Sequence, residues 1–123
     1  MSNEEERKPV QTAPARDSMN HNHAFMTLVD VAHDHQHILA GTTRPAMSAD
    51  GSHVHRIYIR TSFSPIKHKP HWHLVDVITG PSIDVAGGEH THQFDGETSH
   101  DVGHRHCFNS VTDVSPDTTC DDD

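Results

Sequence analysis

Residues 87–108 read GGEHTHQFDGETSHDVGHRHCF, and this stretch is the most informative about the fold. It contains the pattern His-x-His twice, at His90/His92 and at His104/His106. Side chains two residues apart lie on the same face of a β-strand, so each pair presents two imidazoles side by side. The spacing therefore predicts two strands, each of which begins with a pair of aligned histidines.

The same pattern recurs along the chain, which contains six pairs in all: His21/His23, His35/His37, His53/His55, His71/His73, His90/His92 and His104/His106. A longer repeat is visible when HQHILAGTTRPAMSADGSHVHRIYIRTS, from His35, is laid on HWHLVDVITGPSIDVAGGEHTHQFDGETS, from His71. Both segments read His-x-His, Thr, Pro, Gly, a second His-x-His and then Thr-Ser. Such self-similarity is typical of a repeat array.

The residues after each pair continue the strand period. Two positions beyond the second histidine an apolar residue stands in every unit: Phe25, Leu39, Ile57, Val75, Phe94 and Phe108. Six positions beyond it stands Thr in all units but the first, which has Val29: Thr43, Thr61, Thr79, Thr98 and Thr112. The alternation predicts that histidines, apolar residue and threonine face inward, and that the positions between them face water.

Turn-forming residues separate these units. The segments SADGS, SPIKHKP, AGGE and SHDVG supply the Gly, Pro, Asp and Ser that reverse a chain. His33, His68 and His100 fall outside the strand rows and are predicted to be turn histidines. The predicted fold class is all-β, a short-strand repeat array of six His-x-His strands over residues 19–114. Residues 1–18 are predicted to be a disordered tail and residues 115–123 an acidic tail.

Composition limits what else the protein can be. Its 123 residues carry a formal net charge of −9, and Leu, Ile, Val and Phe together number 23, too few for an ordinary apolar core. The acidic balance argues against binding nucleic acid. There is no apolar signal sequence and no run long enough for a membrane helix, so the cytoplasm is the expected location. Cys107 and Cys120 allow one disulfide but are as compatible with two thiols.

The inward histidines predict metal binding. An unpaired buried imidazole is costly to desolvate, a protonated one repels its neighbours, and the chain offers no matching set of inward carboxylates. Two pairs around one ion would form the tetrahedral set that suits zinc, whereas three would form an octahedral set that suits iron(II), nickel or cobalt. The predicted ligands are all twelve residues of the six pairs: His21, His23, His35, His37, His53, His55, His71, His73, His90, His92, His104 and His106.

Two resemblances support this interpretation. The alternation HxHxΦ…T, with TGPSI…GGEHTHQF and GETSHDVGHRHCF, resembles the YmaF family of small bacterial His-x-His repeat proteins, from residue 20 to about 112. The stretch HQHILAGTTR is also similar, more loosely, to the iron-binding needles of phage tail fibres. The second resemblance implies an intertwined, elongated homo-oligomer, with a trimer favoured, in which strands of three chains surround each ion.

The sequence is compatible with three classes of function. A coordination shell filled by imidazoles leaves no position for water or substrate, which predicts a structural metal protein that is not an enzyme. A metal buffer or storage protein is the alternative. A cupin-like metalloenzyme is the rival class, because HTHQFDGETSHDVG places Glu97 five residues after His92, as a cupin motif would. The chain lacks the glycine that precedes the His-x-His pair in cupins, and it lacks the second cupin motif.

Overall fold

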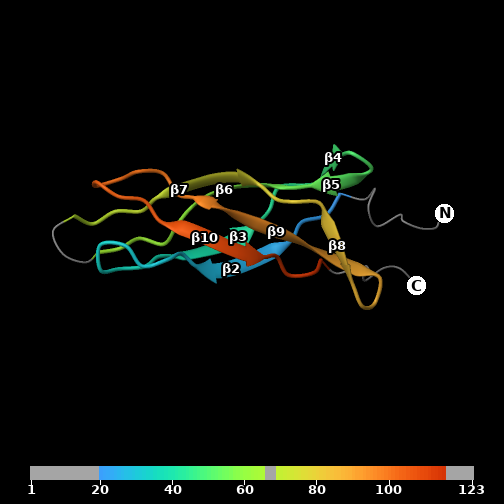
Figure 1. Ribbon diagram of the computed structural model, residues 1–123, viewed down its shortest axis with the longest axis horizontal. Helices are drawn as coiled ribbons and strands as arrows, with labels where there is room; N and C mark the ends of the chain where they lie inside the picture. Colours follow the sequence, from blue (N-terminus) through green and yellow to red (C-terminus); the bar gives the residue numbers. More distant parts are fainter. Residues whose placement is uncertain (1–19, 66–68, 116–123) are drawn as a thin grey trace.

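The computed structural model describes residues 20–65 and 69–115, and this part of the chain is built from β-strands and turns (Figure 1). The strands are β2 (Ala24–Leu28), β3 (Ile38–Thr42), β4 (Met47–Ala49), β5 (Ser52–Val54), β6 (Arg56–Arg60), β7 (Leu74–Ile78), β8 (Ser82–Val85), β9 (Glu89–Glu97) and β10 (Cys107–Val111). Within the described ranges there is no helix, and so none that is long and apolar enough to span a membrane. The predicted N-terminal tail lies outside the described residues. Of the predicted C-terminal tail, the structure describes only Ser115.

The all-β prediction is confirmed, with additions. The six strands that accompany the His-x-His pairs are β2, β3, β6, β7, β9 and β10. They form three antiparallel hairpins, in which β2 pairs with β3, β6 with β7 and β9 with β10. Three further strands were not foreseen: β4 and β5 pair with each other, and β8 adds to the outer edge of β9.

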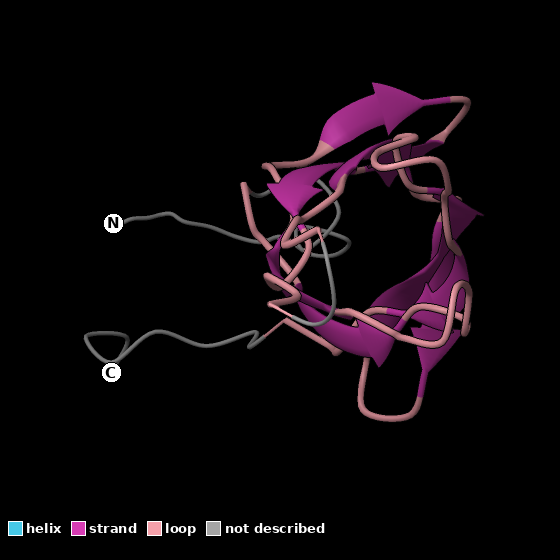
Figure 2. Cartoon of the chain, turned by 90° about the vertical axis from the view of Figure 1, so that its left-hand side faces the viewer, coloured by secondary structure: helices cyan, strands magenta, loops and turns pink. Residues whose placement is uncertain are grey.

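The three hairpins surround one long axis, which Figure 2 views end-on. Backbone hydrogen bonds join neighbouring hairpins where each strand row ends. At one end the bonds are Arg44 N to Arg56 O, Gly80 N to Gln93 O and Asp113 N to Ala24 O, each 2.8 Å. At the other they are Asp30 N to Cys107 O, Ser62 N to Ile38 O and Ser99 N to Leu74 O, at 2.8–2.9 Å. Each hairpin thus contacts the other two, and the ring is closed within one chain.

The apolar core lies on this axis between the histidine pairs. It consists of the six residues predicted from the alternation, joined by Val29: Phe25, Leu39, Ile57, Val75, Phe94 and Phe108. Two glycines make room for their bulkier neighbours. A Cβ at Gly41 would lie 2.5 Å from Ile59 Cδ1, and one at Gly96, where φ is +152°, would lie 2.9 Å from Val77 Cγ1. The packing of Ile59 and Val77 against the core therefore depends on the absence of a side chain at these two positions.

The inward threonines bond to the histidine that they face across each hairpin. The backbone N–H of the second histidine of a pair donates to the threonine Oγ1, at 3.0–3.1 Å: His23 to Thr43, His55 to Thr79, His73 to Thr61, His92 to Thr112 and His106 to Thr98. Val29 occupies the corresponding position opposite His37, and its backbone N–H donates to His37 O. The recurrent threonine thus holds the backbone of the histidine pairs in place.

Tight turns close one end of the molecule. Ala32 bridges to His35 around His33 and Asp34, and Asp101 bridges to His104 around Val102 and Gly103. The two central residues of each turn have positive φ, as hairpin turns require: 52° and 67° in the first, 45° and 84° in the second. His33 therefore lies in a turn, as predicted, and His100 lies outside the strands beside the second turn. His68 lies outside the described residues.

Candidate metal centres

The twelve histidines of the His-x-His pairs come together in two clusters. Site A is His21, His23, His53, His55, His90 and His92, and site B is His35, His37, His71, His73, His104 and His106. Each site takes alternate pairs along the chain. The two strands of a hairpin run in opposite directions, so their histidine pairs lie at opposite ends of it. Every hairpin therefore contributes one pair to each site, and the apolar core separates the sites.

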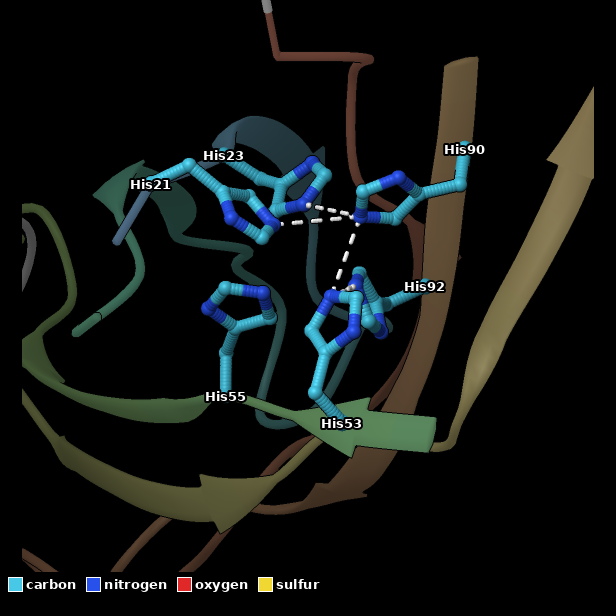
Figure 3. A group of neighbouring side chains, drawn as sticks. All are labelled: His21, His23, His53, His55, His90 and His92. Atoms are coloured by element: carbon cyan, nitrogen blue, oxygen red, sulfur yellow. Dashed lines mark hydrogen bonds between the residues drawn. The ribbon is translucent and has the colours of Figure 1, made fainter. Parts of the chain in front are cut away.

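The six rings of site A converge on one point (Figure 3). Neighbouring Nε2 atoms lie 3.1 Å apart between His21 and His90, between His53 and His90 and between His53 and His92, and 3.2 Å apart between His23 and His90. One ligand atom from each of the six residues lies within 4.8 Å of all the others, and all six residues are buried.

Site B repeats this geometry. The Nε2 atom of His35 lies 3.1 Å from that of His37 and 3.2 Å from those of His71 and His104. The Nε2 atoms of His73 and His104 are 3.2 Å apart. In contrast to site A, two of its members are only partly buried: His35 and His71.

These separations match an octahedral shell. An octahedron with edges of 3.1–3.2 Å places its corners about 2.2 Å from the centre and about 4.5 Å from the opposite corners. The first distance is close to imidazole-to-metal distances in proteins, and the second lies within the 4.8 Å limit that both clusters meet. Each set of nitrogens therefore has the dimensions of a six-coordinate metal site.

Backbone carbonyl groups determine which ring nitrogen carries the proton. The second histidine of every pair places Nδ1 2.8–2.9 Å from a carbonyl oxygen of the neighbouring hairpin, and the pairs are His23 with Asp113, His37 with Ser62, His55 with Arg44, His73 with Ser99, His92 with Gly80 and His106 with Asp30. In site B the Nδ1 atoms of the first histidines also lie near a carbonyl oxygen, that of the residue two positions earlier: His35 with His33 at 3.0 Å, His71 with Lys69 at 2.8 Å and His104 with Val102 at 3.3 Å. A carbonyl oxygen only accepts, so each of these Nδ1 atoms is the donor.

A neutral imidazole has one N–H, so these rings turn an unprotonated Nε2 toward the centre of the cluster. Site B thus directs six lone pairs at one point, an arrangement that is repulsive by itself and is stabilised by a cation. Consistent with this, the buried Nε2 atoms of His55 and His106 have no hydrogen-bond partner in the described part of the chain. The residues present therefore fit a bound metal ion, with the carbonyl groups orienting the ligands from outside.

Burial also favours the neutral form of six of these rings. Burial lowers the pKa of His23 and of His73 to about 4 and that of His55 to about 3, although the backbone hydrogen bonds oppose the shift. Burial likewise lowers the pKa of His37, His104 and His106, and the other histidines of each cluster add to the effect. Neutral imidazole is the form that ligates metal.

Other polar groups of interest lie outside the clusters. The carboxylate of Asp101 lies 3.3 Å from Nδ1 of His73. That of Asp30 lies 3.6 Å from Nδ1 of His106. The sequence did not reveal either contact. Glu97, the residue behind the cupin-like interpretation, faces away from the ligands and pairs with Arg105 at 3.1 Å. Cys107 is an exposed free thiol, whereas Cys120 lies outside the described residues.

Comparison with known proteins identifies one relationship. The profile of the YmaF family, described as spore germination protein GerY/YamF, matches residues 18–114. No curated protein and no solved structure matches the chain. The matched range contains all six His-x-His pairs, and hence every residue of sites A and B.

Proposed function

We propose that this chain, which belongs to the YmaF family, is a structural metal protein that holds two transition-metal ions, one in site A and one in site B. The observation that carries the proposal is the convergence of six imidazoles in each site. In site B all six Nδ1 atoms donate to carbonyl oxygens, so the six Nε2 atoms that face one another carry only lone pairs. A cation is the group that six such lone pairs would bind together.

A filled shell supports a structural role over a catalytic one. Catalytic metal sites keep a coordination position open for water or substrate, whereas six imidazoles occupy all the positions of an octahedral ion. A bound ion would act as a cross-link between the three hairpins, since each contributes two ligands to each site. Because the apolar core is small, such a cross-link would contribute to the stability of the fold.

The geometry also favours a class of metal. Zinc is commonly held by four ligands in a tetrahedral set, which would leave two imidazoles of each site unused. Six neutral nitrogens at octahedral separations suit iron(II), nickel(II) or cobalt(II) better. We therefore propose one of these three ions, and iron(II) as the one to test first.

The biological setting and the assembly are proposed on other grounds. The description of the family refers to spore germination, and we assign the chain to that process on the family match alone. The homotrimer stays a prediction. Because one chain supplies the six ligands of each site, a trimer is no longer needed to complete a shell, and association of copies would rest on the outer faces of the hairpins.

Elemental analysis of protein purified without an affinity tag tests the proposal. We expect two metal ions per chain, with native mass spectrometry giving the number of chains. Cobalt(II) loading should give the weak visible absorption of a six-coordinate ion instead of the intense bands of a tetrahedral one. Protein that contains no transition metal and takes up none of the three proposed ions would overturn the proposal.

A further inference from the structure

Resting on the proposed function, we infer that the two sites exchange metal differently: site A is closed, whereas site B exchanges its ion through a pocket beside His104. The histidines are arranged alike in both sites, and the sites differ in what surrounds them.

Additional strands enclose site A. His53 belongs to β5, and β8 pairs with β9 at His90 and His92. The hydroxyls of Ser52 and Ser82, 3.0 Å apart, link β5 to β8 outside the ligands. As a result every histidine of site A is at most 8% exposed. Exchange of an ion there requires displacement of paired strands.

Only turns and isolated bridges cover site B among the described residues. Its end of the molecule lies away from β4, β5 and β8, on the left of Figure 1. The first histidine of each of its pairs takes part in an isolated bridge: Ala32–His35, Ser64–His71 and Asp101–His104. Two of them, His35 and His71, are partly exposed. A ligand at this end can therefore rotate away from the ion without breaking a sheet.

A pocket of about 390 Å³ leads to this end of the ligand set, and it is lined by Asp30, His33, His100, His104, Arg105 and Cys107, among others. The ring of His33 stacks on that of the ligand His104, with centroids 4.5 Å apart. The carboxylate of Asp30 accepts the N–H of Cys107 at 3.0 Å and lies 3.6 Å from Nδ1 of the ligand His106. Three side chains able to ligate a metal, Asp30, His33 and His100, thus line the space beside site B without belonging to it.

The pocket also contains a positive group that opposes a cation. Arg105 lies 3.1 Å from Nε2 of His100, which must be the acceptor because a guanidinium only donates, and it pairs with Glu97 at 3.1 Å. An incoming divalent cation would first bind Asp30, His33 and His100 as transient ligands. It would then pass to His104 and the other ligands of site B. Arg105 would slow this transfer by occupying His100.

Release of nickel from the Ni²⁺-loaded full chain into a coloured chelator tests the inference. We expect two phases of equal amplitude. The variant with His33→Ala and His100→Ala should slow the fast phase several-fold and leave the slow one unchanged, whereas Arg105→Ala should quicken the fast phase. A matched control is the variant with Ser48→Ala and Asp84→Ala, two exposed residues at the other end.

The outcomes separate the two proposals. A chain that binds no nickel would contradict the proposed function itself. A chain that binds two ions and releases both in a single phase would leave that function standing and overturn the difference between the sites. If two phases appear but the pocket variants behave like the control, the pocket is not the route. The variant with His90→Ala and His92→Ala assigns the phases, because it should retain only the fast one.

Discussion

The Nδ1 atom of His23 lies 2.8 Å from the carbonyl oxygen of Asp113, ninety residues further along the chain. His23 precedes the first strand of the first hairpin, and Asp113 follows the last strand of the third. The bond therefore joins the two ends of the ring of hairpins and at the same time orients a ligand of site A. Closure of the ring and orientation of a histidine of site A thus depend on the same hydrogen bond.

Loss of one histidine pair should remove one ion only. His90→Ala together with His92→Ala leaves four imidazoles of site A around a cavity, while the six ligands of site B are untouched. We expect about one bound ion per chain in place of two, and a loss of several kcal/mol in stability, because buried polar groups lose their partner.

Metal content and melting temperature measure this effect. The matched control is Gln93→Ala with Asp95→Ala on the same strand, where both side chains are exposed, and it should retain both ions. Equal effects of the two double variants would show that the inward face of β9 has been misassigned.

Removal of metal should unfold the chain. The seven buried apolar side chains that form the core are few for a domain of this length, and the entropy of ordering the backbone opposes folding throughout. A strong chelator is therefore expected to abolish the β-sheet signal in circular dichroism, and renewed addition of the metal should restore it. An unchanged spectrum in protein shown by elemental analysis to be metal-free would refute this dependence.

Acid should destabilise the protein between about pH 6.5 and pH 4. Unfolded histidine takes up a proton near its ordinary pKa of 6.5, whereas burial lowers the pKa of His23 and His73 to about 4 in the folded chain. In this interval the unfolded state binds more protons, so stability falls as the pH falls. Bound metal and the circular dichroism signal should decrease together over the same range.

A surface carboxylate provides the control for this titration. Asp76 pairs with Arg56 at 2.8 Å on the outer face of the second hairpin, and this pairing lowers the pKa of Asp76. Asp76→Asn should leave the midpoint of the acid transition where it is, because an exposed ion pair contributes little. A midpoint that moves with Asp76 would mean that surface carboxylates, and not the histidines, cause the acid sensitivity.

The inward threonines should matter through their hydroxyl groups. Thr98 Oγ1 accepts the backbone N–H of His106 at 3.0 Å, and both residues are buried. Thr98→Val keeps the shape but removes the acceptor, so we expect a loss of about 1–3 kcal/mol in the free energy of unfolding. Thr42→Val, on the exposed face of β3, is the matched exchange and should cost less than about 0.5 kcal/mol. Denaturant titration of both variants decides the matter.

Local pattern was sufficient to predict the composition of the core. Phe25, Leu39 and Phe94 are buried as expected, because alternation along a strand directly determines which side chains share a face. Strands β4, β5 and β8 were missed, because they contain no His-x-His pair followed by an inward row; His53 in β5 belongs to the pair that precedes β6. Asp30 and Asp101 were also missed, since their approach to His106 and His73 depends on the packing of different hairpins.

The inward orientation of the six histidine pairs could be predicted from the sequence, since a period of two needs no knowledge of distant residues. The prediction that each pair lies within its strand holds only for His90/His92 in β9, because most of the other histidines precede the strand that they accompany. Which pairs meet depends on the tertiary structure. Antiparallel hairpins send consecutive pairs to opposite ends, so His90/His92 joins His53/His55 and His21/His23 instead of its neighbour His104/His106. The number of ligands per site, and the carbonyl groups that orient them, follow from the closure of three hairpins into one ring, a relationship between segments that no local pattern encodes.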